Sequence, residues 1–156
     1  MTEALVYIGL VMVVVGVGYA AMYNCIDYSI LLRRNSDDIA NALHAGERWR
    51  ADVRGASRQV ALEGAGADQI LRLAGNAHRI DYRFSGENVL RRLDSGPWVP
   101  VLAHVKASAM ISDRRGDVAA WRWELELQPR AKGAIKPGRV RPLFTFLAAP
   151  GSAVQP

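Results

Sequence analysis

The sequence predicts an α+β protein in which a long N-terminal helix packs on an antiparallel β-sheet. Residues 4–26 contain no charged side chain, and the residues after them, to about 54, repeat apolar side chains at helical spacing. Beyond Gly55, apolar and polar side chains alternate with a period of two, which is typical of half-buried strands. The 156-residue length suits one domain plus an anchor. We therefore expect three parts: a transmembrane anchor over residues 1–32, a soluble domain over residues 33–149, and a disordered tail over residues 150–156.

The uncharged stretch from Ala4 to Ile26 is long enough to cross a membrane. At ~1.5 Å per residue a helix of this length spans about 35 Å, and the hydrocarbon core of a bilayer is ~30 Å thick. No basic segment precedes the stretch and no small-x-small site closes it, so a transmembrane helix fits better than a signal peptide. Within it, Gly9, Gly16 and Ala20 allow a second helix to approach closely, although ordinary bilayer composition explains them equally well.

Glu3 is a lone carboxylate directly before this apolar helix. Composition alone favours a solvated residue at the membrane interface, where the carboxylate also suits the positive end of the helix. The alternative is a buried charge that needs a positive partner, because an unpaired carboxylate in hydrocarbon costs several kcal/mol.

The second half of the helix is predicted to be amphipathic and to continue to about residue 54. Its apolar stripe recurs at three- and four-residue steps and consists of Ile39, Leu43, Gly46, Trp49 and Val53. Two oppositely charged pairs, Arg34 with Asp38 and Arg48 with Asp52, stand four residues apart and are expected on the solvent side.

The soluble domain is predicted to contain consecutive strands from about residue 58 that form one antiparallel meander. The strand predictions are residues 69–73, 79–85, 89–93, 105–111, 121–128 and 143–148. One face of this sheet is expected to pack on the amphipathic half of the helix. The alternating rows of Arg, Glu and Gln are expected to face solvent.

The formal charge of +5 is scattered over the soluble part, which is typical of a solvated surface. A nucleic-acid-binding face needs clustered charge, so no nucleic acid is expected as a partner. Residues 129–142 form a basic segment rich in Pro and Gly, which predicts a mobile loop. This loop is either a solvated connection or a contact surface for an acidic partner or a phosphate backbone. The contact residues would be Arg130, Lys132, Lys136, Arg139 and Arg141.

Sequence patterns for catalysis and metal binding are absent. None of the three histidines stands at a metal-binding spacing, and Cys25 is the only cysteine, which excludes paired-cysteine sites and internal disulfides. No phosphate-binding loop or nucleophile elbow occurs. Asp113 and Asp117 are the acidic candidates for a calcium site, but they flank two arginines whose positive charge disfavours binding of a cation. We therefore expect no enzyme activity, cofactor, metal or small-molecule substrate.

The segment Thr2-Glu3-Ala4-Leu5-Val6-Tyr7-Ile8-Gly9-Leu10 resembles the start of mature type IV pilins and type II secretion pseudopilins. Those proteins begin with Phe-Thr-Leu-x-Glu before an apolar helix, and Glu3 matches the family's glutamate. The order of helix and strands is also similar to that of minor pseudopilins, especially the J-type. The family's basic leader, processing glycine and first two mature residues are absent here, so cleavage of a leader and methylation of the N-terminus stay open.

The resemblance implies a non-catalytic subunit of a type II secretion or type IV pilus-like assembly that serves protein transport and polymerises through its N-terminal helix. Glu3 would pair with the N-terminal amine of its own or an adjoining chain. The implied partners are other pilin or pseudopilin subunits and, before assembly, lipid of the bacterial inner membrane. The protein would cross that membrane once, with its C-terminal domain in the periplasm. The residues leave one alternative open, a single-pass anchored envelope-binding module outside any filament.

Overall fold

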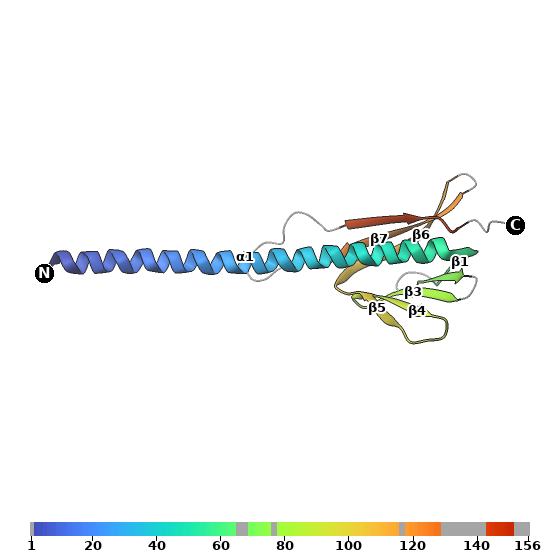
Figure 1. Ribbon diagram of the computed structural model, residues 1–156, viewed down its shortest axis with the longest axis horizontal. Helices are drawn as coiled ribbons and strands as arrows, with labels where there is room; N and C mark the ends of the chain where they lie inside the picture. Colours follow the sequence, from blue (N-terminus) through green and yellow to red (C-terminus); the bar gives the residue numbers. More distant parts are fainter. Residues whose placement is uncertain (1, 65–68, 76–77, 116–117, 129–142, 152–156) are drawn as a thin grey trace. The chain divides into compact units, whose positions relative to one another are not determined.

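The computed structural model describes residues 2–64, 69–75, 78–115, 118–128 and 143–151 (Figure 1). The chain divides into two compact units, residues 1–37 and residues 38–156, each of which is described by itself. The anchor was predicted to end at residue 32, five residues before this division. Side chains 33–37 are exposed, and the first buried side chain of the helix is Ala42.

Helix α1 runs from Thr2 to Gly55, close to the range predicted from the sequence. Glu3 lies in its first turn and Arg54 in its last, which suits the positive and negative ends of the helix. The amide of Gly151 donates a hydrogen bond of 3.0 Å to the carbonyl oxygen of Arg54. This contact satisfies one of the carbonyl groups that a helix leaves free at its C-terminus.

The described strands form two antiparallel sheets, so the prediction of a single meander was wrong. The first sheet has the order β1-β2-β3-β4-β5 and the second the order β6-β7-β8. The strands are β1 (Ala56–Glu63), β2 (Ile70–Gly75), β3 (Arg79–Ser85), β4 (Asn88–Leu93), β5 (Val99–Leu102), β6 (Val105–Arg115), β7 (Val118–Leu127) and β8 (Leu143–Ala148). The chain leaves the first sheet at His104, whose φ of 59° lies in the left-handed region and redirects the backbone. The α+β class is confirmed.

Residues 42–53 of α1 bury one stripe against side chains of both sheets. From the helix the stripe contains Ala42, Ala45, Trp49 and Val53. The ring of Trp49 lies 5.8 Å from that of Trp123 on β7, which lies 5.4 Å from that of Phe146 on β8. Fully buried aromatic and aliphatic side chains supply most of the stability of such a core.

Two residues of the predicted stripe lie elsewhere. Ile39 is 43% exposed and Leu43 is 49% exposed, so their assignment to the buried stripe was wrong. The helix instead turns the smaller Ala42 and Ala45 inward, beside Gly46, which was predicted in the stripe and is buried. These small residues allow the strands to approach the helix closely, which larger side chains at the same positions would prevent.

The alternation predicted for β6 is interrupted by a bulge. The pairing of β6 with β7 shifts register between Val105 and Ala107. A bulge inserts one extra residue, so the residues that follow it change faces. Met110 is therefore buried, whereas Ile111, which was predicted to face the core, is 36% exposed.

Candidate membrane-contact and assembly surface

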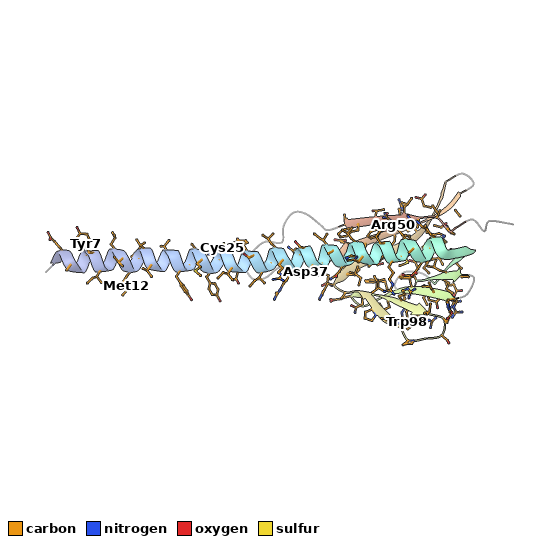
Figure 2. All side chains as sticks on the ribbon, in the orientation of Figure 1. Tyr7, Met12, Cys25, Asp37, Arg50 and Trp98 are labelled. Carbon is orange, nitrogen blue, oxygen red and sulfur yellow. The ribbon has the colours of Figure 1, made fainter. Side chains whose placement is uncertain are left out.

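Residues 4–26 of α1 form an apolar helical surface whose described side chains are all exposed. Its large hydrophobic side chains are between 48% and 72% exposed, and Figure 2 shows Tyr7, Met12 and Cys25 projecting from the helix. Soluble monomers rarely expose apolar patches larger than a few hundred Å². Within the described part of the chain, α1 is the one helix long and apolar enough to cross a membrane. The surface therefore suits contact with lipid or with other apolar helices.

Glu3 lies exposed in the first turn of α1, just before this surface. Its carboxylate makes no hydrogen bond or ion pair with a described residue. Met1, whose amine is the predicted partner in the same chain, lies outside the described residues. Among the described residues, then, no side chain occupies the Glu3 carboxylate.

The three predicted helix-packing residues share one side of α1. At 100° per residue, Gly9, Gly16 and Ala20 point within about 40° of one another. A Cβ atom placed on Gly9 or Gly16 would meet no atom within 4 Å. The chain itself does not fill these positions, so they offer a flat strip to a second helix.

The predicted basic contact residues, by contrast, lie outside the described residues. They are Arg130, Lys132, Lys136, Arg139 and Arg141.

Asp52 is a centre of polar contacts between α1 and the first sheet. Its carboxylate accepts hydrogen bonds from the Tyr82 hydroxyl at 2.5 Å, the Arg91 Nε at 2.8 Å and the Arg91 Nη2 at 3.3 Å. The side chain of Asp52 is only 14% exposed, so its predicted solvent-side pairing with Arg48 was wrong. A carboxylate so far removed from water needs several donors, which Tyr82 and Arg91 supply from directly opposite positions on β3 and β4.

These contacts fix the protonation of the donors. Burial, together with the hydrogen bond to the negative Asp52, raises the pKa of Tyr82 far above its ordinary value. The hydrogen bond to Asp52 raises the pKa of Arg91, against the opposing effect of its burial. Tyr82 is thus a permanent donor and Arg91 a permanent cation. This cluster could have been predicted in part from the sequence. When the two strands are paired as a hairpin, Arg91 lies opposite the apolar row of β3, which places a charged residue on the core face.

Asp81, on the other face of the first sheet, is completely buried, although the polar row containing it was expected to face solvent. Arg92 holds its carboxylate through Nη2 at 2.5 Å and Nε at 3.1 Å. The guanidinium of Arg92 lies 4.5 Å from the centre of the Trp98 ring, and that of Arg83 lies 4.7 Å from it (Figure 2). Arg79 Nε lies 3.5 Å from Asp81 Oδ1, so two arginines, Arg92 and Arg79, neutralise this buried carboxylate. A polar row predicted to face solvent gives no sign of such burial.

One histidine of the domain, His78, makes a local contact with an aspartate. His78 Nδ1 lies 2.9 Å from Asp94 Oδ2, and the backbone amide of Arg79 donates to Asp94 Oδ1 at 2.7 Å. The backbone hydrogen bond, followed by the contact with His78, lowers the pKa of Asp94 below its ordinary value. Among the described residues, no group of three His, Cys, Asp or Glu side chains converges on a common point.

No protein-family model matches the chain, and no curated protein or solved structure shows significant similarity to it. A proposal of function must therefore be based on the surfaces of the chain described above.

Proposed function

We propose that this protein is a non-catalytic, membrane-anchored subunit of a pilin-like assembly of the type II secretion or type IV pilus class. The observation that carries the proposal is the exposed, uncharged helical surface of residues 4–26. In the second unit, residues 42–53 of the same helix are built into a folded α+β domain. One element thus supplies both a membrane-length apolar surface and part of a domain core.

The helix would have two successive environments. Before assembly, lipid of the bacterial inner membrane covers residues 4–26, and the C-terminal domain lies on the periplasmic side. In the assembly, helices of other pilin or pseudopilin subunits replace the lipid. The strip of Gly9, Gly16 and Ala20 lets backbones approach closely, which favours van der Waals packing between helices.

Glu3 would determine the position of each subunit's helix relative to the neighbouring helices. Inside a bundle of apolar helices, its carboxylate pairs with the N-terminal amine of its own or an adjoining chain. An uncompensated buried charge costs about 3–5 kcal/mol, so a shifted helix that leaves Glu3 unpaired is strongly disfavoured. This cost fixes the position of the helix without adding stability to the isolated subunit.

The test replaces Glu3 by Gln and by Leu and measures membrane insertion and co-assembly separately. Insertion is followed by resistance to alkaline extraction, and assembly by oxidative cross-linking through Cys25, which is exposed and the only cysteine. We expect insertion to persist and cross-linking to fall at least tenfold. Asp37→Asn, which removes an exposed carboxylate of the same helix, is the matched control and should assemble normally (Figure 2). Normal insertion together with normal cross-linking in both Glu3 variants would refute the pairing role.

A further inference from the structure

The core face of the first sheet extends beyond the side chains that cover it. Directly opposed residues on antiparallel strands point to the same face, and Tyr82 lies opposite Arg91, which lies opposite Val99. By the same register Leu93 shares the face of Ile80. Tyr82 is fully buried, yet Leu93 is 44% exposed and Val99 is 55% exposed. Apolar residues on a core face are thus left open at the β4–β5 side of the sheet.

A groove of about 340 Å³ occupies this uncovered region. Its lining includes Arg48 of α1, Arg91 and Leu93 of β4, and Pro97, Val99 and Pro100 around β5. The wall is therefore mainly aliphatic, with two guanidinium groups among the apolar side chains. Concave sites of this composition, apolar with a few fixed polar groups, are typical binding sites.

The groove carries a surplus of positive charge. Asp52 engages Arg91 through Nε and Nη2, which leaves Arg91 Nη1 without a described partner and holds the guanidinium in place. Arg48 makes no ion pair or hydrogen bond with a described residue. Two guanidinium groups therefore stand against one carboxylate, which Tyr82 also engages. An anionic group entering the groove would meet one preorganised and one adjustable cation.

The edge strand β5 is poorly suited to pair with an added strand. It has only four residues, and Pro100 lies within it. Proline has no amide hydrogen to donate and is one of the features that prevent pairing at sheet edges. Recognition at this groove must therefore come from side chains and not from extension of the sheet.

We propose that this groove binds a partner protein through a segment in which a carboxylate side chain is flanked by aliphatic ones. The carboxylate matches the planar guanidinium groups of Arg48 and Arg91, and the aliphatic neighbours cover Leu93 and Val99. An apolar anchor beside a charge-assisted contact is also the pattern that concentrates binding energy at protein interfaces. The proposal goes beyond helix-mediated assembly and holds whether or not the chain polymerises through α1.

The test uses the full-length protein in detergent micelles and two fluorescently labelled peptides. The probe is acetyl-Leu-Glu-Leu-Glu-Leu-amide and its matched control is acetyl-Leu-Gln-Leu-Gln-Leu-amide, which has the same size and similar polarity without the charge. Binding is followed by fluorescence anisotropy at low and moderate salt. We expect the glutamate peptide to bind at least tenfold more tightly than the glutamine peptide.

Variants separate the two halves of the site. Arg48→Gln removes an exposed guanidinium and is expected to weaken the glutamate peptide five- to tenfold, and Leu93→Ser is expected to weaken both peptides. Arg54→Gln removes another exposed guanidinium of α1 that does not line the groove, and it should bind like the unchanged protein. Equal affinity for the two peptides, absence of binding at millimolar peptide, or equal effects of Arg48→Gln and Arg54→Gln would each overturn the proposal. The proposal would also be overturned if heparin displaced the glutamate peptide and peptide binding did not depend on Leu93. That result would indicate a general anion-binding surface.

Discussion

Replacing Gly46 with alanine probes the contact between α1 and β8. A Cβ atom at residue 46 would overlap Cε1, Cζ and Cδ1 of the Phe146 ring. The ring cannot withdraw easily, because it packs on Trp123 with centroids 5.4 Å apart and on the Arg50 guanidinium at 5.4 Å (Figure 2). The added methyl group must therefore push the helix and the sheet apart or force Phe146 from its position.

Two opposing effects set the magnitude. Alanine is favoured over glycine inside a helix by about 1 kcal/mol. Inserting a methyl group into a filled core costs about 1–3 kcal/mol, and a contact this short places Gly46→Ala near the upper end. The expected net loss is about 2 kcal/mol. For a domain of this size that corresponds to a fall in Tm of about 6–10 °C.

Thermal unfolding of the full-length protein in detergent, followed by near-ultraviolet circular dichroism, measures this change. Gly55→Ala is the control, because a Cβ atom at Gly55 meets nothing within 4 Å, and its Tm should stay the same or rise. Phe146→Leu alone should also lower the Tm, but the double variant should lose less than the sum of the single losses. A Tm for Gly46→Ala at or above that of the unchanged protein, or strict additivity in the double variant, would refute the reasoning.

Three further substitutions test polar contacts of the domain. Asp52→Asn leaves Arg91 without its charged partner and should lower the free energy of unfolding in urea by about 2 kcal/mol, whereas Asp37→Asn should change it by less than about 0.5 kcal/mol. Asp81→Asn removes a fully buried carboxylate that is the charged partner of Arg92 and should cost about 3 kcal/mol in the same measurement; a loss below about 0.5 kcal/mol would contradict this. The lowered pKa of Asp94 means that its contribution is present above the ordinary Asp pKa of ~3.9 and is lost as the pH falls through the folded-state pKa. The Tm of the unchanged protein should therefore fall toward that of Asp94→Asn below about pH 4, and a constant difference from pH 6 to pH 2 would argue against it.

Local patterns in the sequence predicted the secondary structure well. The absence of charge in residues 4–26 and the helical spacing after it indicated one helix, and α1 runs from Thr2 to Gly55. The period-two alternation in residues 79–85 corresponds to β3 (Arg79–Ser85). Such patterns are readable because they depend only on which side chains neighbouring residues direct to each face.

The arrangement of the strands depended on features that no local pattern shows. The change from the first to the second sheet occurs at His104. Histidine is enriched among non-glycine residues with a left-handed backbone, but such residues are too uncommon for a single histidine to predict one. The shift between Val105 and Ala107 likewise reversed the buried side of β6 without any glycine or proline at the bulge. Both features are decided by how the strands pack on the helix, which is a tertiary effect.

For the candidate site, the sequence indicated the apolar helix, Glu3 and the small residues along one side of α1. It did not indicate the groove, because Arg48 belongs to the helix and Val99 to a short strand that was not predicted. The pairing of Asp52 with Arg91 joins residues 39 positions apart. Only the folded structure brings such residues together. The i,i+4 spacing rule paired Asp52 with Arg48, which was the wrong arginine.

The packing of Trp49 against Trp123 and Phe146 has a consequence for synthesis of the chain. The helix emerges from the ribosome early, whereas the strand that carries Phe146 is made about 100 residues later. At ~5–20 residues per second this delay is about 5–20 s. During that interval the indole of Trp49 has no finished core to enter, although all of α1 has already been made. The core around Trp49 therefore stays incomplete until β8 is translated.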